Sequence, residues 1–106
     1  MIYKQADAKI IYKEQDSVGK MLGTHAGCDF VKLVIKPGAA IESHSLEMDV
    51  TFFVVSGTGR IALNDHSDQV SKSDLVTVNA GVMREWQNTG ADDLVLLVIK
   101  HMGNSK

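Results

Sequence analysis

The chain has 106 residues, of which 44% are hydrophobic and 23% charged, a composition typical of one globular domain. Its 11 lysines and arginines and 13 aspartates and glutamates give a formal charge of -2, which argues against a nucleic-acid partner. Cys28 is the single cysteine, so an internal disulfide is excluded. The apolar runs are far shorter than the roughly 20 residues of a membrane-spanning helix, and the N-terminus lacks a signal-peptide pattern. We therefore expect a cytoplasmic protein with no membrane partner.

The first 29 residues are expected to form an N-terminal arm of strand and loop, which belongs either to the main domain or to a dimer interface. Within the arm, the segment 8–23 (AKIIYKEQDSVGKMLG) is compatible with a strand entering a loop or with a short helix, and we favour strand and loop. Residues 30–102 are expected to form the main β-domain. The last four residues, 103–106 (GNSK), have the composition of a frayed tail.

Six segments of the main domain are rich in β-branched and aromatic residues and have the length of strands. Between them lie the short stretches PGAA, SGTG, NDHSD, NAGV and NTGADD, which contain the residues that favour turns. In chain order, the expected strands are 30–36, 50–55, 59–63, 74–78, 84–88 and 94–100. The sequence therefore predicts an all-β fold of at least six strands.

Two of these strands are apolar on both faces. Val50, Phe52 and Val54 alternate with positions that are mostly apolar as well, and 94–99 contains no polar residue. A sheet with one solvated face would show a clean alternation of apolar and polar residues, so a second layer should cover the outer face. We expect this layer to be a partner subunit, and hence a homodimer.

The stretch 37–59, PGAAIESHSLEMDVTFFVVSGTG, resembles the first sequence motif of the cupin family. In that motif a glycine is followed after five residues by His-x-His, then after three or four residues by a glutamate and after six more by a glycine. Gly38, His44 and Gly57 fall at the expected positions. Leu46 replaces the second histidine and Val50 replaces the glutamate, so two of the family's metal ligands are missing.

Residues 73–88, SDLVTVNAGVMREWQN, resemble the second cupin motif, in which a glycine, a Pro-x-Gly, a histidine and an asparagine recur at fixed spacing. Gly81 and Asn88 match this motif. Ser73 and Asn79 replace the first glycine and the proline. Arg84 occupies the position of the last metal-ligating histidine, so a third ligand is missing.

The resemblance implies a single cupin domain over residues 30–102, that is, a double-stranded β-helix or jelly-roll-like barrel of two sheets with its active site at the barrel mouth. Family members often bind iron, manganese, nickel or zinc there. Such an ion needs about three or four nitrogen, oxygen or sulfur ligands, and of the four motif positions only His44 offers one. The fixed positive charge of Arg84 would also repel a cation. We therefore predict no metal and no other cofactor at this site.

Period-two geometry places alternate residues of a strand on one face, and by resemblance this face lines the cavity. The expected ligand-binding residues are His44, Arg84, Phe52, Trp86, Leu46 and Val50, with Met48 and Met83 at the rim. An apolar pocket with two polar anchors suits a small organic ligand that has an apolar body and a carboxylate or other anion. We expect Arg84 to bind the anion, and His44 to donate a hydrogen bond or to act as a general acid or base.

Each of these residues also has a purely structural interpretation. His44 could be bonded to a neighbouring carboxylate or backbone group, and the two aromatic residues could be core. Arg84 could form a buried ion pair that fills the emptied metal site. The candidate partners for that ion pair are Glu47, Asp49 and Glu85.

A metal site could also be rebuilt from ligands outside the motif positions. Glu47 and Asp49 could form a displaced site with His44, although their odd spacing places them in a turn or on the opposite strand face. His25 and Cys28 have a spacing compatible with a soft-metal site, but they need further ligands. His66 and His101 are the remaining histidines, with no assigned place.

The leading functional hypothesis is a small-molecule-binding cupin that needs no metal and acts as a sensor or carrier. In an enzymatic version, His44 transfers a proton in an isomerisation, epimerisation or lyase reaction while Arg84 stabilises a carboxylate or enolate. A catalytic His44 should have an orienting carboxylate on its other ring nitrogen, whereas binding requires only fit. The alternative is a metal-dependent dioxygenase, isomerase or lyase.

Overall fold

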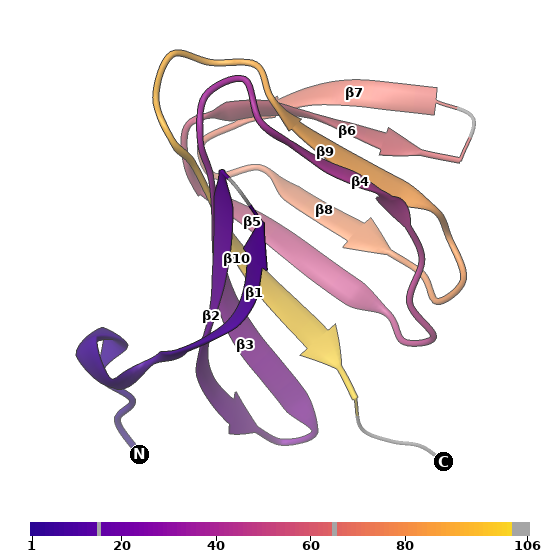
Figure 1. Cartoon of the computed structure of the whole chain (residues 1–106). Helices are drawn as coiled ribbons and strands as arrows, with labels where there is room; N and C mark the ends of the chain where they lie inside the picture. Colours follow the sequence, from indigo (N-terminus) through magenta and orange to yellow (C-terminus); the bar gives the residue numbers. More distant parts are fainter. Residues whose placement is uncertain (15, 65, 103–106) are drawn as a thin grey trace.

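The computed structural model describes residues 1–14, 16–64 and 66–102, and this part of the chain is almost entirely β-structure (Figure 1). A short 3-10 helix, η1 (Gln5–Asp7), precedes the strands. The ten strands of the described residues are β1 (Lys9–Glu14), β2 (Ser17–His25), β3 (Cys28–Ile35), β4 (Ala40–His44), β5 (Val50–Ser56), β6 (Thr58–Leu63), β7 (His66–Ser71), β8 (Leu75–Val78), β9 (Arg84–Asn88) and β10 (Leu94–His101).

The strands form two antiparallel sheets that face each other as a jelly-roll barrel (Figure 1). The larger sheet has six strands in the order β1-β2-β3-β10-β5-β8, and the smaller has four in the order β4-β9-β6-β7. Alternate apolar residues from both sheets point inward and form one core. The expected all-β double-stranded barrel is confirmed.

All six expected strands are present, and their ends differ from those predicted by at most two residues. The sequence reading missed β4 and β7 and did not resolve the N-terminal segment into two strands. The interpretation of NDHSD as a connection was wrong, because β7 begins at His66 within it. The side chains of β7 are almost all exposed, so its sequence has no apolar alternation, and it is a strand because it pairs with β6 from Leu63↔His66 to Thr58↔Ser71.

The N-terminal residues complete the larger sheet. β1 pairs with β2, and β2 pairs with β3, so the segment we expected to be strand and loop adds two strands to the barrel. The pairing of β1 with β2 is irregular between Ile10 and Tyr12. The expected tail at 103–106 lies outside the described residues.

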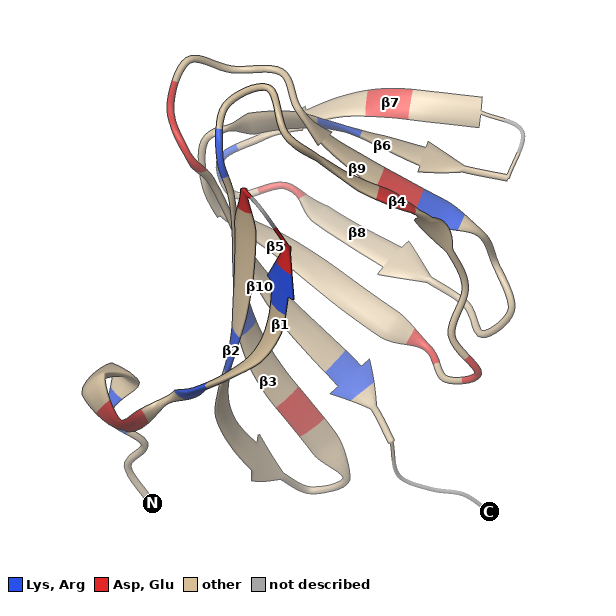
Figure 2. Ribbon diagram, viewed as in Figure 1, with Lys and Arg blue, Asp and Glu red and all other residues tan. Residues whose placement is uncertain are grey.

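The outer face of the larger sheet is mainly apolar over β10, β5 and β8, as the two-sided strands indicated, whereas it carries lysines over β2 and β3. Phe53 and Leu97 lie opposite each other on this face and are half-buried, while Val55 and Leu75 are exposed. Charged residues of both signs are scattered over strands and loops (Figure 2). Within the described residues, no helix has the length and apolar character needed to cross a membrane.

Gly57 shows why the first motif requires a glycine where β5 turns into β6. Its φ is +91°, in the left-handed region that favours glycine, and a Cβ atom there would lie 2.5 Å from the carbonyl oxygen of Asp93. Gly38 also has a positive φ, +79°, but a Cβ atom added to it would meet open space. The turn at Gly57 therefore depends on both backbone conformation and close packing.

Asn88, which matches the asparagine of the second motif, is a structural residue. It is 2% exposed, and its Nδ2 donates hydrogen bonds of 2.8 Å to the carbonyl oxygens of Ile35 and Asp92. Its Oδ1 accepts a 2.8 Å bond from the Gly90 backbone N–H. One buried side chain therefore joins the end of β3 to the loop between β9 and β10.

Candidate functional site

A cavity of about 140 Å³ lies between the two sheets, and its lining is mainly apolar. Five of the six expected ligand-binding residues line it: His44, Leu46, Phe52, Arg84 and Trp86. The sixth, Val50, is packed in the core and is 1% exposed. The structure therefore brings residues of β4, β5, β9 and the loop after β4 to one cavity.

Three further features of the lining were not expected from the sequence. Ile11 and Tyr12 of β1 form one side of the cavity, Gly19 of β2 adds a wall with no side chain, and Lys100 of β10 adds a second cationic group. The irregular pattern of β1 gave no signal for Tyr12. Lys100 could have been found by extending the alternation of Leu94, Leu96 and Val98 by one step.

Arg84 is the central polar group of the cavity. The β9 strand alternates buried and exposed residues, so Arg84 and Trp86 both point inward and are 3% and 2% exposed. The Arg84 Nε and Nη1 atoms and the Trp86 Nε1 atom are buried without a hydrogen-bond partner. Because buried polar groups in native proteins are nearly always paired, these donors mark a place where an acceptor is missing.

The guanidinium lies over an aromatic ring that packs against a second one. Arg84 Cζ lies 5.7 Å from the centroid of the Phe52 ring, within the range of a cation–π contact. The Phe52 and Trp86 rings meet edge to face at 5.2 Å. Among the described residues no carboxylate forms an ion pair with Arg84, so the interpretation of a buried ion pair with Glu47, Asp49 or Glu85 is not supported.

Burial shifts the titration of two cavity residues. Loss of hydration lowers the pKa of Arg84, which nevertheless stays protonated because guanidinium groups do not deprotonate in proteins. Burial also raises the pKa of Tyr12, and the nearby carboxylates of Glu14 and Glu42 raise it further. The cavity thus combines a buried permanent cation with a neutral phenol.

His44 lies at the mouth of the cavity and is exposed. Its Nδ1 is 3.0 Å from the Glu42 carbonyl oxygen and donates to it, which leaves Nε2 as the acceptor in the neutral ring. A second, more polar hollow of about 410 Å³ begins at His44 and Tyr12 and extends over Glu14 and Glu42. His44 therefore separates an apolar interior from an acidic outer groove.

The other candidate residues lie elsewhere. Glu47 and Asp49 are exposed in the loop between β4 and β5, where an Asp49 carboxylate oxygen accepts a 2.8 Å bond from the Ala80 N–H. Met48 packs against the core, and neither it nor the exposed Met83 lines the cavity. The expected methionine rim is therefore absent from the described lining.

Cys28 and His101 are neighbours on the outer face of the larger sheet, with Sγ and Nδ1 3.6 Å apart. The His101 Nε2 atom is 3.0 Å from Thr51 Oγ1. His25 lies opposite Cys28 in the β2–β3 hairpin and is exposed. In the described part of the chain, no three His, Cys, Asp or Glu side chains are placed to hold a metal ion.

The residues at the cupin metal positions do not fit a divalent cation. The donor set consists of one imidazole, His44, because Leu46 and Val50 have no donor atom and Arg84 is positively charged. A single neutral ligand beside a buried guanidinium gives a cation too little compensation for its lost hydration.

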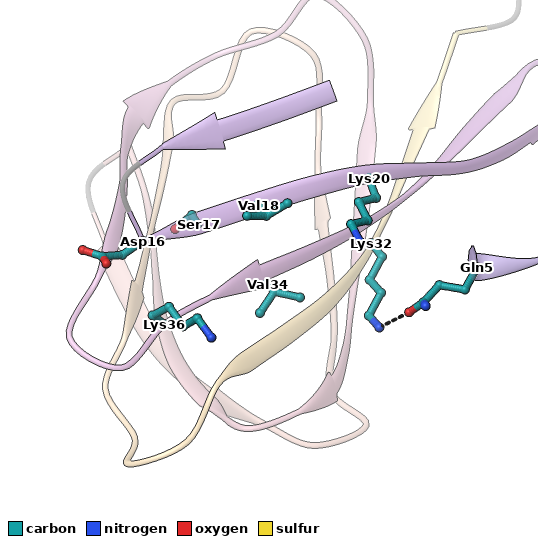
Figure 3. A pocket seen from close by; sticks show the side chains of 8 residues that line it. All are labelled: Gln5, Asp16, Ser17, Val18, Lys20, Lys32, Val34 and Lys36. Carbon is teal, nitrogen blue, oxygen red and sulfur yellow. Dashed lines mark hydrogen bonds between the residues drawn. The ribbon is translucent and has the colours of Figure 1, made fainter. Parts of the chain in front are cut away.

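A separate groove of about 290 Å³ runs over the outer face of β2 and β3 (Figure 3). Lysines dominate it, but Lys32 Nζ donates a 2.6 Å bond to Gln5 Oε1, and Lys36 forms an ion pair of 3.5 Å with Asp93. The positive charge of the groove is therefore partly balanced by Asp93, whereas the guanidinium in the cavity between the sheets has no carboxylate partner among the described residues.

Comparison with known proteins places the fold in a family. A model described as a cupin domain matches residues 31–100. A 5-nitrosalicylic acid 1,2-dioxygenase from Bradyrhizobium sp is 28% identical over 89 residues, which are 84% of this chain and 41% of that protein. The chain thus spans about two fifths of the length of this curated relative.

Several solved structures have the same fold. KdgF from Halomonas sp. superposes with a TM-score of 0.83 at 18% identity, covering 95% of this chain and 94% of that one. An RmlC-like cupin from Shewanella frigidimarina gives 0.84 at 16% identity, with 96% and 90% covered. An oxalate decarboxylase from Bacillus subtilis gives 0.82 at 19% identity, with 92% and 28% covered. With its two-sheet barrel, its motif glycines and a matching domain model over residues 31–100, this chain belongs to the cupin family.

Proposed function

We propose that this cupin domain binds a small aromatic carboxylate without a metal ion, with Arg84 and Trp86 as the donors to the carboxylate. The observation that carries the proposal is the set of three buried nitrogen donors without acceptors, which belong to two residues that line an apolar cavity. A carboxylate accepts hydrogen bonds in a fork that matches a guanidinium edge, and an indole N–H can add a further bond.

The size and lining of the cavity indicate that the apolar body of the ligand is a single aromatic ring. An engineered apolar cavity of about 150 Å³ takes up benzene, so about 140 Å³ suits a single aromatic ring. Phe52 and Trp86 offer ring edges and faces for stacking. The name of the Bradyrhizobium relative supports the same class, because 5-nitrosalicylic acid is an aromatic carboxylic acid.

The surroundings of His44 favour binding over proton transfer. Its ring is exposed, and its Nδ1 donates to a backbone carbonyl oxygen rather than to the carboxylate that we expect beside a catalytic histidine. We expect His44→Ala to change the affinity for benzoate by less than about threefold, as for a residue at an exposed rim.

The direct experiment is a titration with benzoate by calorimetry and by fluorescence of Trp86, the single tryptophan of the chain. Replacing Arg84 by methionine should weaken binding at least about tenfold, which corresponds to ~1.4 kcal/mol. The matched control is Arg60→Met, because Arg60 is exposed on β6 and lies outside the cavity. Equal affinities of Arg84→Met and the wild type would overturn the proposal.

A metal-dependent enzyme is the second candidate, and the dioxygenase among the relatives is the observation that favours it. Elemental analysis of protein purified without added metal tests it, since stoichiometric iron, manganese, nickel or zinc would end our preference. The double variant Arg84→His and Leu46→His restores two imidazoles at motif positions and should raise zinc affinity over the wild type. Unchanged affinity would contradict the mapping of the motif onto the cavity.

We also propose that the apolar part of the outer face of the larger sheet, over β5, β8 and β10, pairs with a second copy of the chain. Exposed Val55 and Leu75 and the half-buried Phe53 and Leu97 support this arrangement. Analytical ultracentrifugation should give a dimer for the wild type and a shift towards monomer for Leu75→Lys. A monomeric wild type at micromolar concentration would refute the dimer.

A further inference from the structure

We propose that Lys100 is a second anion-binding residue of the cavity and that the ligand is accordingly a single-ring aromatic dianion. This inference rests on the proposed function, because it adds a second charged contact to the carboxylate site at Arg84. It narrows the ligand class from aromatic acids in general to those with two negatively charged groups.

First, Lys100 lies on the inward-facing side of its strand, β10. On β10, Leu94, Leu96 and Val98 point inward and are between 0% and 5% exposed, and Lys100 continues the same alternation. Lys100 lines the cavity together with Val98. The part-buried Lys100 thus adds a cationic residue to a lining that is mainly apolar.

The second argument is the absence of a protein partner among the described residues. Lys100 lies opposite Asp29 of β3 and Val50 of β5, yet it forms no ion pair or side-chain hydrogen bond with them. Two lysines of the outer groove behave differently, since Lys36 pairs with Asp93 and Lys32 with Gln5. The ammonium group of Lys100 is thus available to a ligand.

The third argument is the charge of the lining as a whole. Arg84 and Lys100 are cationic, and among the described residues no aspartate or glutamate lines the cavity. A ligand with one carboxylate would leave one of the two cations without a counter-charge. A ligand with two anionic groups matches both cations, and its apolar ring occupies the space between them.

The test compares a monoanion with dianions of the same ring. Benzoate is titrated beside phthalate, isophthalate and terephthalate, because their carboxylates are spaced differently around one ring. For the wild type we expect at least one dicarboxylate to bind about tenfold more tightly than benzoate. In Lys100→Gln the dicarboxylates should lose more affinity than benzoate, so that the preference disappears, and Lys100→Arg should keep the preference.

Lys20→Gln is the matched control, because it removes the same charge from the groove on the outer face (Figure 3). It should leave all affinities unchanged, and added salt should reduce the contribution of Lys100. The inference is overturned if no dicarboxylate binds the wild type more tightly than benzoate, or if Lys100→Gln keeps the preference. In both cases the proposed function stands as long as benzoate binding depends on Arg84. Failure of every probe to bind the wild type would overturn both.

Discussion

Replacing Arg84 by methionine distinguishes a ligand-binding arginine from a structural one by the sign of its effect on stability. Methionine has a similar length and no charge, so it can occupy the space beside Phe52 without needing acceptors. If Arg84 serves a ligand, the protein without ligand carries unsatisfied donors, and their removal should stabilise it. If Arg84 fills a structural role, its removal should destabilise the barrel.

The magnitude follows from the contacts of the side chain. Each buried donor without a partner costs about 1–3 kcal/mol, and two Arg84 nitrogens are in that state. The cation–π contact with Phe52 offsets roughly 0.5–2 kcal/mol of this cost. Replacement of whole buried ion pairs by well-packed apolar residues is often neutral or stabilising by about 1–4 kcal/mol in other proteins. We therefore expect Arg84→Met to raise the free energy of unfolding by about 2 kcal/mol.

Urea unfolding followed by Trp86 fluorescence measures this change directly. With an m-value of about 1–3 kcal/mol/M, a gain of about 2 kcal/mol moves the midpoint to higher urea by about 1 M. The corresponding rise in Tm is about 8 °C or more for a domain of this size. Arg60→Met, on the exposed face of β6, should stay within about 0.5 kcal/mol of the wild type.

The reasoning fails if Arg84→Met lowers the free energy of unfolding by about 1 kcal/mol or more while Arg60→Met does not. That outcome would assign Arg84 to the barrel's own stability, and the unpaired donors would no longer indicate a ligand. If Arg84→Met is more stable than the wild type but binds benzoate with the same affinity, the stability argument holds and the proposed function is wrong.

Three further predictions concern the scaffold. Gly57→Ala should lower the free energy of unfolding by about 2–4 kcal/mol, because backbone strain at φ +91° adds to a clash with Asp93. Gly38→Ala causes strain alone and should lower it by about 1–2 kcal/mol. Urea unfolding measures both changes, and equal losses would contradict the packing argument. Asn88→Ala should cost about 2–4 kcal/mol because it leaves buried backbone groups unpaired; a loss below about 1 kcal/mol would refute its bridging role. Because the pKa of Tyr12 is raised above 10.0, its contribution to stability is complete below that pH and is lost as the pH rises through the folded value. Unfolding of Tyr12→Phe at about pH 8 and about pH 11 should therefore show a smaller alkaline loss of stability than the wild type, and an equal loss would contradict the shift.

Much of the barrel can be predicted from local sequence alone. The alternation of Val50, Phe52 and Val54 places these side chains in the core, as does that of Leu94 and Leu96, because a strand has a side-chain period of two whatever its neighbours are. The motif glycines mark turns for an equally local reason, since a positive φ favours glycine in any context. Sequence therefore determined the fold class and the main strands.

The site depended on contacts between distant segments. Tyr12 and Lys100 reach the same cavity only because β1 and β10 lie in one sheet, 88 positions apart in the chain, and no local pattern encodes that proximity. The polar strand β7 likewise exists through its pairing with β6. Whether Arg84 has an acidic partner was also undecidable from spacing, because spacing does not show whether the side chains of Glu47, Asp49 or Glu85 lie beside the guanidinium. Only the tertiary structure, in which these carboxylates are exposed and the guanidinium is buried, shows that Arg84 has no carboxylate partner among the described residues.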